Sequence, residues 1–376
     1  MAVTVQPGIT YAELGSYLHQ RGYALPNYAS LPHLSVGGAI ATATHGSGAK
    51  LGNLATSVRS VEMVAANGDL VRLTRGEPLF KHAVVTLGAG GVIVEVSLDV
   101  EAAFDVQQCI YTDISFKTLK PHLSQILEET YSVSLFTQFR YGNLLNSVWL
   151  KHKLPKGADP IVCPFIAGRP PQTTSVHPIP TMSADACSPP GAGPSYMQLP
   201  HFLPTHTPSH GAELQTELFL KREHMEQALK RLFLFEKKTN HLEEILLISE
   251  VRFIAADDMT LSPQRILGDA VGLHFTWKPE LDKLLLLLPQ ILDLLSEFKP
   301  VPHWAKVFQP RAFDFEERYG EVLVQFKTQF LDRYDPQRKF TTDFVRTCLF
   351  PTEPVSETSS NVAQEEKGSL ETHAEL

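Results

Sequence analysis

The segment Ala29–Gly48, ASLPHLSVGGAIATATHGSG, constrains this chain more than any other stretch of the sequence. Its paired glycines allow the backbone to come close to a partner, because glycine has no Cβ. Ser35 is a favourable N-cap residue, so we expect a short helix over 36–42 whose free N–H groups face the space in front of it. Such a helix end favours phosphate or another anionic group. Composition alone leaves two interpretations open, a buried glycine-rich turn or a ligand cradle.

Two later stretches place polar side chains on one face of a predicted strand. In ISEVRFIA, Glu250 and Arg252 are two residues apart and therefore share a face of the sheet. In GLHFTW, His274 and Thr276 share a face in the same way, while the apolar residues between them point to the other side. The two strands are expected to be neighbours. The alternative is a solvated sheet face with cross-strand ion pairs.

The glycine-rich segment closely resembles the flavin-contacting segment of the alditol oxidases, a family in the vanillyl-alcohol-oxidase class of FAD enzymes; aldonolactone oxidases carry a looser version. The resemblance continues through YSVSLFTQF, SEVRFIAADDMTLSP, LHFTWK, HWAKVF and DPQRKFTTDFVR. It spans roughly residues 2–349, and a long ordered match is far more specific than a single glycine motif. It implies an α+β protein with a partial FAD-binding domain of the PCMH type and a cap, or substrate, domain containing a large antiparallel sheet covered by helices.

The resemblance and the change in periodicity together divide the chain. Residues 1–103 are expected to form the C-terminal lobe of the FAD-binding domain, and residues 104–308 the substrate domain. Within the latter, residues 154–211 are rich in Pro, Gly, Ser and His and are too long for a plain connector, so we expect an irregular excursion that wraps the surface or borders a site. Residues 309–350 are expected to form a helical segment that packs back on the FAD domain, and residues 351–376 a disordered tail.

Periodicity and turn residues predict the order of the elements. Thr10 and Glu13 have the spacing of a helix capping box, and Asn67-Gly68 between two apolar alternations predicts a hairpin. From residue 213 the pattern predicts strand, helix, strand, strand, helix and strand, which is typical of an antiparallel sheet covered by helices on one face. The other expectations are a β-rich run over 83–100, helices over 117–129, 278–298 and 313–334, strands over 133–139 and 147–153, and a short strand around Lys306.

The resemblance implies roles for individual residues where the family motifs match. The residues expected to bind substrate are Ser30, Glu250, Arg252, His274, Thr276, His303 and Lys306. The residues expected to contact the flavin are Ser30, Ser35, Gly38, Thr42, Ala43, Thr44, His45 and Ile93. The implied reaction oxidises the terminal alcohol of a small polyol, with dioxygen as the acceptor and hydrogen peroxide as a product.

The chemical types of these residues suit that reaction. Arg252 and Lys306 could stabilise alkoxide-like character on the substrate. His274 is the favoured proton acceptor, and Lys306 with a lowered pKa is the alternative. Glu250, Ser30 and Thr276 would hold the hydroxyl groups of a neutral polyol.

Composition and spacing exclude several other classes. The formal charge of −8 argues against a nucleic-acid surface, and no signal segment or membrane-length apolar run occurs, so a soluble cytoplasmic protein is expected. The GAGG at 88–91 lacks the spacing of a nicotinamide-type dinucleotide motif. No metal site is expected, because the histidines of the excursion lack ligand spacing and are expected to be surface or structural residues: His177, His201, His206 and His210. The cysteines are expected to be reduced packing residues: Cys109, Cys163, Cys187 and Cys348.

Two alternative functions remain open at this point. One is an aldonolactone oxidase of the arabinono- or gulono-lactone type. The other is a truncated, non-catalytic remnant. The resemblance implies this alternative because the family has a further N-terminal lobe that binds the FAD pyrophosphate. In alditol oxidases this lobe carries a histidine that is covalently bonded to FAD. Only 29 residues precede Ser30 here, and they contain no such loop.

We therefore expect this chain to hold FAD non-covalently at best, and weakly, since the pyrophosphate-binding lobe is not in this sequence. The visible absorbance of the purified protein, set against its protein concentration, measures the bound flavin. About one flavin per chain after gel filtration would contradict the expectation of weak binding.

Overall fold

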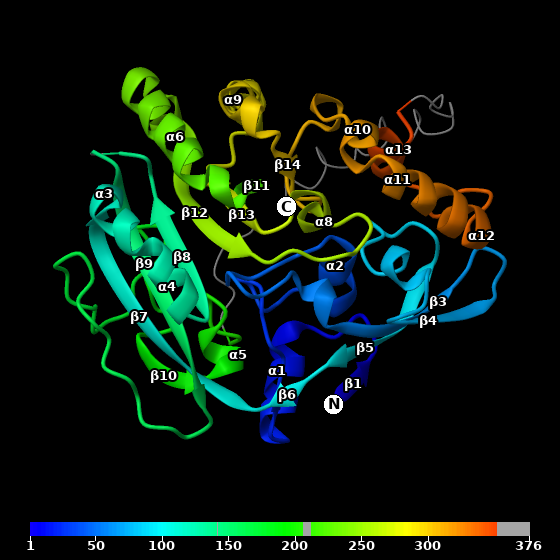
Figure 1. The fold of residues 1–376 in the computed structure, drawn as a ribbon, viewed down its shortest axis with the longest axis horizontal. Helices are drawn as coiled ribbons and strands as arrows, with labels where there is room; N and C mark the ends of the chain where they lie inside the picture. Colours follow the sequence, from blue (N-terminus) through cyan, green and yellow to red (C-terminus); the bar gives the residue numbers. More distant parts are fainter. Residues whose placement is uncertain (141, 206–211, 352–376) are drawn as a thin grey trace, which may run out of the picture.

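Strands from separate parts of the chain form one large antiparallel sheet in the computed structural model, which describes residues 1–140, 142–205 and 212–351. Within those residues the strand order is β10-β7-β9-β8-β12-β13-β11-β14. The strands are β7 (Phe104–Ser115), β8 (Ser132–Thr137), β9 (Leu144–Pro155), β10 (Gly191–Pro194), β11 (Leu214–Lys221), β12 (Leu246–Ile254), β13 (Ala270–Trp277) and β14 (Val301–Pro302). The sheet runs from β10 and β7 at the left of Figure 1 to β11 and β14 near its centre.

Helices α6 (Met225–Thr239) and α9 (Leu281–Leu295) complete the order β11, α6, β12, β13, α9, β14, which confirms the predicted alternation. Two short helices lie between these elements in addition, α7 (His241–Ile245) before β12 and α8 (Pro263–Leu267) between β12 and β13. The ring of Phe139 lies 5.2 Å from Phe233 of α6 and 6.1 Å from Phe275 of β13, measured between centroids. The apolar face of the sheet therefore packs against the helices, and the predicted α+β class with a helix-covered antiparallel sheet is confirmed.

The register of three neighbouring strands puts polar side chains in one row. On β13, His274 pairs with Glu217 of β11 on one side and with Glu250 of β12 on the other. Arg252 and Thr276 lie on the same face as this row, because side chains two residues apart on a strand share a face. The predicted pairing of the EVR strand with the HFT strand is thus confirmed.

The N-terminal third forms a separate four-stranded sheet in the order β1-β5-β3-β4. Its elements and the helices beside it are β1 (Ala2–Val5), α1 (Tyr11–Gln20), α2 (Val36–Ala41), β3 (Val58–Val64), β4 (Leu70–Thr74) and β5 (Val92–Asp99). A two-stranded ladder joins β2 (Tyr23–Ala24) to β6 (Glu101–Ala102). Thr10 and Glu13 make the predicted capping box, Ser35 caps α2, and β3 and β4 pair as the predicted hairpin.

Several predicted elements are shorter or broken. The helix expected over 117–129 is divided at Pro121, and the one over 313–334 is divided at Gly320, whose φ is +50°. The strand expected around Lys306 is β14, four residues earlier, and Lys306 itself lies in the turn that follows. The helical pieces are α3 (Phe116–Leu119), α4 (Leu123–Glu129), α10 (Phe315–Tyr319), α11 (Glu321–Gln325), a π-helical turn (Phe326–Leu331) and α12 (Asp332–Tyr334).

The β-rich run expected over 83–100 is a strand only from Val92 onward. Gly90 has φ +88°, and a Cβ at this position would overlap the ring of Phe330. Backbone contacts join the same two regions, since Ala66 N donates to Tyr334 O at 2.8 Å. The C-terminal helices therefore pack against the N-terminal third. The domain boundaries themselves stay predictions, and the tail from residue 352 lies outside the described residues.

The excursion contains regular structure and is tied to the sheet. Its later part forms β10, which pairs with β7, and then α5 (Ser195–Gln198). Cys163 in its first part forms a disulfide with Cys109 of β7, with the two Cα atoms 5.8 Å apart. The prediction that all four cysteines are reduced is wrong for this pair, whereas Cys187 and Cys348 are free and buried. Cysteine spacing alone could not predict a bond between residues 54 positions apart. Reduced cysteines were also one argument for the predicted cytoplasmic location, and the disulfide removes that argument.

Within the part of the chain that the structure describes, none of the helices combines the length and the apolar character needed to cross a bilayer.

A thiol titration tests the disulfide directly. In denaturant without reductant we expect two reactive thiols per chain, Cys187 and Cys348, and all four after reduction. Cys163→Ser should lower the free energy of unfolding by about 2–4 kcal/mol, because it frees a long loop in the unfolded state. Reductant should destabilise the wild type and leave the variant unaffected. Four reactive thiols in the unreduced protein would show that the bond does not form.

Candidate functional site

A cavity of about 380 Å³ lies between the glycine-rich segment and the polar face of the large sheet. One wall comes from the loop and helix of Ala29–Gly48, and the other from β11, β12, β13 and the turn after β14. The predicted site residues that line it are Ser30, Ser35, Gly38, Thr42, Thr44, His45, Glu250, Arg252, His274, Thr276, His303 and Lys306. The structure thus brings these side chains to one place, while their individual roles stay predictions.

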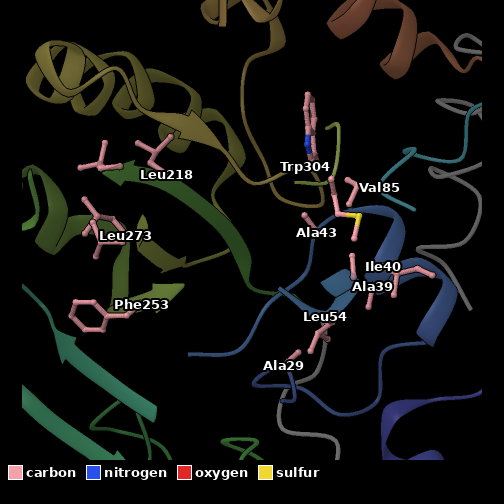
Figure 2. Close-up of a cluster of buried hydrophobic side chains, with 14 of the residues drawn as sticks. Ala29, Ala39, Ile40, Ala43, Leu54, Val85, Leu218, Phe253, Leu273 and Trp304 are labelled. Atoms are coloured by element: carbon pink, nitrogen blue, oxygen red, sulfur yellow. The ribbon is translucent and has the colours of Figure 1, made fainter. Parts of the chain in front are cut away.

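The glycine-rich segment has one buried face and one face toward the cavity. Ser35 Oγ accepts the N–H of Gly38 at 3.3 Å, and helix α2 begins there. Ala39, Ile40 and Ala43 lie in a cluster of buried apolar side chains, where Figure 2 shows them near Leu54 and Val85. This packing fixes which side of the helix faces the cavity.

Two predicted flavin contacts are not among the cavity residues. Ala43 follows the C-cap residue Thr42 of α2, has a left-handed φ of +53°, and points into the apolar cluster of Figure 2. Ile93 lies on β5 in the N-terminal sheet, opposite Met63 of β3. Any contact of Ala43 or Ile93 with the flavin would therefore lie outside this cavity.

Glu217 of β11, which sequence reasoning missed, lies directly behind the cavity. Its carboxylate accepts from Nη2 of Arg252 at 2.8 and 2.7 Å, and the side chain is fully buried. His45 Nε2 lies 3.2 Å from one carboxylate oxygen, and His274 Nδ1 lies 3.4 Å from the other. Lys306 Nζ is 3.8 Å away. Four ionisable side chains from separate parts of the chain thus meet at one carboxylate.

The signal for Glu217 was present in the sequence ELQTELFL. Gln215 and Glu217 alternate with Thr216 and Leu218, so the period of two places both polar side chains on the cavity face. Gln215 lines the cavity, and its Oε1 accepts from Lys306 Nζ at 2.7 Å.

Gly272 explains how Arg252 reaches Glu217 across an intervening strand. On β13, Gly272 pairs with Arg252 of β12 on one side and with Phe219 of β11 on the other. A Cβ at residue 272 would lie 2.7 Å from Glu217 Oε1 and 3.3 Å from Cε1 of Phe219. The guanidinium and the carboxylate therefore meet over a position where only a hydrogen atom projects from the backbone.

Burial and neighbouring charges set the ionisation of these groups. Burial alone would raise the pKa of Glu217, but the charge of Arg252 and the ring of His45 outweigh it and hold that pKa well below its usual value. Burial lowers the pKa of Lys306 to about 8. Burial, followed by the positive charge of Lys306, lowers the pKa of His274 to about 4. At neutral pH the cavity therefore holds a neutral imidazole at His274 beside two cations, Arg252 and Lys306.

The environment of His274 defines which ring nitrogen is free to accept a proton. A carboxylate only accepts hydrogen bonds, so Glu217 favours the tautomer with hydrogen on Nδ1. The other nitrogen, Nε2, then carries the lone pair and lies 3.1 Å from Thr276 Oγ1. The arrangement of carboxylate, imidazole and hydroxyl gives a base that is held in one orientation.

Three of these side chains also have the spacing of a metal site. Ligand atoms of His45, Glu217 and His303 lie within 4.8 Å of one another. Both oxygens of Glu217, however, already accept from Arg252, and the charges of Arg252 and Lys306 lie within 4 Å of that carboxylate. A divalent cation there would face two positive charges with one anion, so the donor set favours an organic ligand over a metal ion.

The excursion supplies further cavity residues, in contrast to the surface or structural role expected for its histidines. His177 and His201 are buried and line the cavity, and His201 Nε2 donates to Glu250 Oε1 at 2.7 Å. His206 and His210 lie outside the described residues. The composition of the excursion predicted a segment that wraps the surface or borders a site, but it carried no signal for which histidines would face inward.

The cavity wall at α2 fits the edge of a flavin ring. A Cβ at Gly38 would meet only Ser35 Oγ within 4 Å, so a ligand can approach the backbone there. Thr42 and Thr44 offer hydroxyl groups on the same wall. Nε of Arg252 is buried and has no hydrogen-bond partner among the described residues, which leaves a charged donor for a ligand.

Comparison with known sequences gives matches along most of the chain. The family model described as "FAD binding domain" matches residues 1–74, and the model described as "D-arabinono-1,4-lactone oxidase" matches residues 214–348. An alditol oxidase of Streptomyces sp. (strain IKD472) is 40% identical over 349 residues, which cover 92% of this chain and 81% of that protein. An L-gulono-1,4-lactone dehydrogenase of Mycobacterium tuberculosis is 26% identical over 367 residues, covering 93% of this chain and 82% of that protein.

Solved structures of the same fold are more distant in sequence. A solvent-stable cholesterol oxidase superposes with a TM-score of 0.69 at 16% identity, covering 92% of this chain and 81% of that chain. The crystal structure of cholesterol oxidase from B. sterolicum gives a TM-score of 0.67 at 15% identity, covering 93% of this chain and 81% of that chain. At these identities the likeness concerns the fold alone.

Gly272→Ala tests how tightly the pair of Arg252 and Glu217 is packed. We expect the free energy of unfolding to fall by about 1–3 kcal/mol, because the added methyl overlaps a carboxylate that cannot move away from its partners. Denaturant unfolding measures this loss. Gly8→Ala is the matched control, since a Cβ at residue 8 would meet nothing within 4 Å. Equal stability of the two variants would show that the carboxylate has room to shift.

Proposed function

The chain belongs to the alditol oxidase family of FAD-dependent oxidoreductases, and from that premise we propose that it oxidises the terminal CH–OH of an alditol with dioxygen as the acceptor. The products are an aldose and hydrogen peroxide. One observation carries the proposal: the hydroxyl-binding and charged residues of the strands line the same cavity as the glycine-rich segment.

FAD is the cofactor, and the residues proposed to hold it are those of the glycine-rich wall together with two outside the cavity. They are Ser30, Ser35, Gly38, Thr42, Ala43, Thr44, His45 and Ile93. The chemistry that a bound flavin would supply is to accept a hydride from the carbinol carbon and to pass the electrons on to dioxygen. The protein's own side chains would carry out the rest of the reaction.

The substrate hydroxyls are proposed to bind the polar groups of the strands. Glu250 is ionised and accepts hydroxyl donors, because burial, which would raise its pKa, is outweighed by His201 and Arg252, which lower it. Ser30 Oγ and Thr276 Oγ1 lie at the same cavity and can both donate and accept. His303 lines the wall beside them. A cavity with several hydroxyl-bonding groups and balanced charge suits a neutral polyol.

Proton transfer and charge stabilisation are assigned to different residues. His274 is neutral at pH 7, and its Nε2 lies 3.1 Å from Thr276 Oγ1 at the cavity wall, which supports its assignment as the group that takes the hydroxyl proton of the substrate. Lys306, with a pKa of about 8, is mostly protonated at that pH and donates to Gln215, so it acts as a cation rather than as the base. Lys306 and Arg252 would then stabilise the oxygen as negative charge develops on it.

Aldonolactone oxidation is the second candidate, favoured by the match of residues 214–348 to the D-arabinono-1,4-lactone oxidase model. A lactone presents its ring carbonyl to Arg252 and Lys306, which could bind it in the same cavity. A non-catalytic remnant is the third candidate.

The partners proposed for the oxidase are a small-molecule substrate and dioxygen. The cytoplasmic location stays a prediction, which cell fractionation would check.

A peroxide assay separates the candidates. The FAD-loaded chain should release hydrogen peroxide with xylitol or sorbitol and show a lower kcat/KM with gulono- or arabinono-lactone. A preference for the lactones would favour the second candidate. An FAD-loaded chain that releases no peroxide with either class would favour the remnant.

The pH profile tests the assignment of Lys306. kcat/KM should fall as pH rises through about 8, because the Lys306 ammonium loses its proton there. Lys306→Arg keeps the charge to higher pH and should shift that limb upward. Lys306→Met should lower kcat/KM by about 10²–10³ and remove the limb. An alkaline limb unchanged in both variants would assign it to another group.

A further inference from the structure

Lys151 on β9 is a fully buried lysine outside the cavity, and the proposed reaction gives it no role. Its side chain is 1% exposed, although lysine is almost never fully buried unless its charge is paired. Its Nζ donates to two backbone carbonyls, Leu199 O at 2.6 Å and Pro200 O at 3.2 Å. Burial lowers the pKa of Lys151 to about 7, so keeping a charge here is costly. An amine donates hydrogen bonds whether or not it is charged, and the two bonds from Nζ hold one point of the excursion.

The residues that follow reach the substrate cavity. His201 and Phe202 both donate their backbone N–H to Ser30 O, at 3.1 and 3.3 Å, and both side chains line the cavity. Ser30 Oγ in turn accepts from Nη1 of Arg252 at 3.3 Å. The segment 199–202 thus joins the sheet, through Lys151, to the glycine-rich segment, through Ser30.

His201 is fixed from three sides. Its ring lies 5.0 Å from Trp149 of β9 and 5.5 Å from Phe136 of β8, between centroids. Its Nε2 carries the hydrogen, because the carboxylate of Glu250 at 2.7 Å can only accept. One oxygen of Glu250 is thereby occupied, and the other lies 3.7 Å from Arg252 Nε. The orientation of the Glu250 carboxylate therefore depends on His201, and the position of His201 depends on the segment that Lys151 holds.

We propose that Lys151 and His201 are positioning residues for substrate recognition: Lys151 anchors segment 199–202, and the anchored His201 orients Glu250 toward the substrate hydroxyls. The inference rests on the proposed function for its substrate. It assigns the excursion a part in recognition, and it requires neither residue to touch the reacting atoms.

Hydrogen–deuterium exchange tests the anchor without any activity. Lys151→Met keeps a long apolar chain, leaves Leu199 O without its donor and leaves Pro200 O with Ser188 Oγ alone. Amides of residues 201–203 should therefore exchange faster than in the wild type. Lys153→Met on the same strand is the matched control, because Lys153 pairs with Glu101 at the surface. Exchange in Lys151→Met equal to that of the wild type would overturn the anchor.

Steady-state kinetics test the orientation of Glu250. His201→Phe keeps the ring packing and removes the donor, and we expect KM for the alditol to rise about 10- to 100-fold with a smaller change in kcat. His201→Gln, which keeps an N–H donor, should restore part of the loss, and Lys151→Met should raise KM in the same way. In His201→Phe the acid rise in KM should also move to higher pH, since Glu250 loses the partner that lowers its pKa.

An unchanged KM in His201→Phe would overturn the role in recognition even if the anchor stands. If the FAD-loaded wild type oxidises no alditol, the proposed function fails and recognition fails with it, while the exchange experiment still decides whether Lys151 holds the segment. The two failures are therefore distinguishable.

Discussion

The buried ion pair between Glu217 and Arg252 is the interaction on which the site depends. Taking two charges out of water is expensive, and the cost is offset only when geometry is good and the remaining donors and acceptors are satisfied. Both conditions hold for the carboxylate, which accepts twice from Arg252 and has His45 and His274 at its other sides. The pair thereby fixes a histidine from the glycine-rich segment, a histidine from the sheet and a cation from β12 relative to one another.

The same pair explains the division of roles in the cavity. Glu217 offsets the charge of Arg252 from behind the cavity, and the charged side chains that line the cavity are those of Glu213, Glu250, Arg252 and Lys306. Glu217 also favours the hydrogen of His274 on Nδ1, so the lone pair of Nε2 faces Thr276 Oγ1 at the cavity wall. A single carboxylate outside the cavity lining therefore influences both the charge of Arg252 and the tautomer of His274, which do line the cavity.

Local patterns in the sequence predicted much of this arrangement. The period of two in EVR and HFT gave the shared polar face, and the N-cap and capping box were readable from residue spacing alone. Most of the site residues that the resemblance implied for this sequence lie at one cavity. Glu217 was missed although ELQTELFL has the same alternation, because the matching family motifs lie on the neighbouring strands.

Features that depend on contacts distant in sequence could not be predicted. The disulfide of Cys109 with Cys163 and the inward turn of His201 arise from the path of the excursion, which no periodicity describes. The β-rich run predicted over 83–100 carries no sign that the ring of Phe330, from the other end of the chain, excludes a side chain at Gly90. In each case the determining partner lies far away in the sequence.

A double-mutant cycle on the free energy of unfolding tests the central ion pair most directly, with Glu217→Gln, Arg252→Met and the combined variant. We expect each single change to lower the free energy of unfolding by about 3–5 kcal/mol, because it leaves a buried charge without its partner. The double variant should lose at least about 2 kcal/mol less than the sum of the two single losses. Losses that add within about 0.5 kcal/mol would contradict the account, because the two side chains would then not depend on each other.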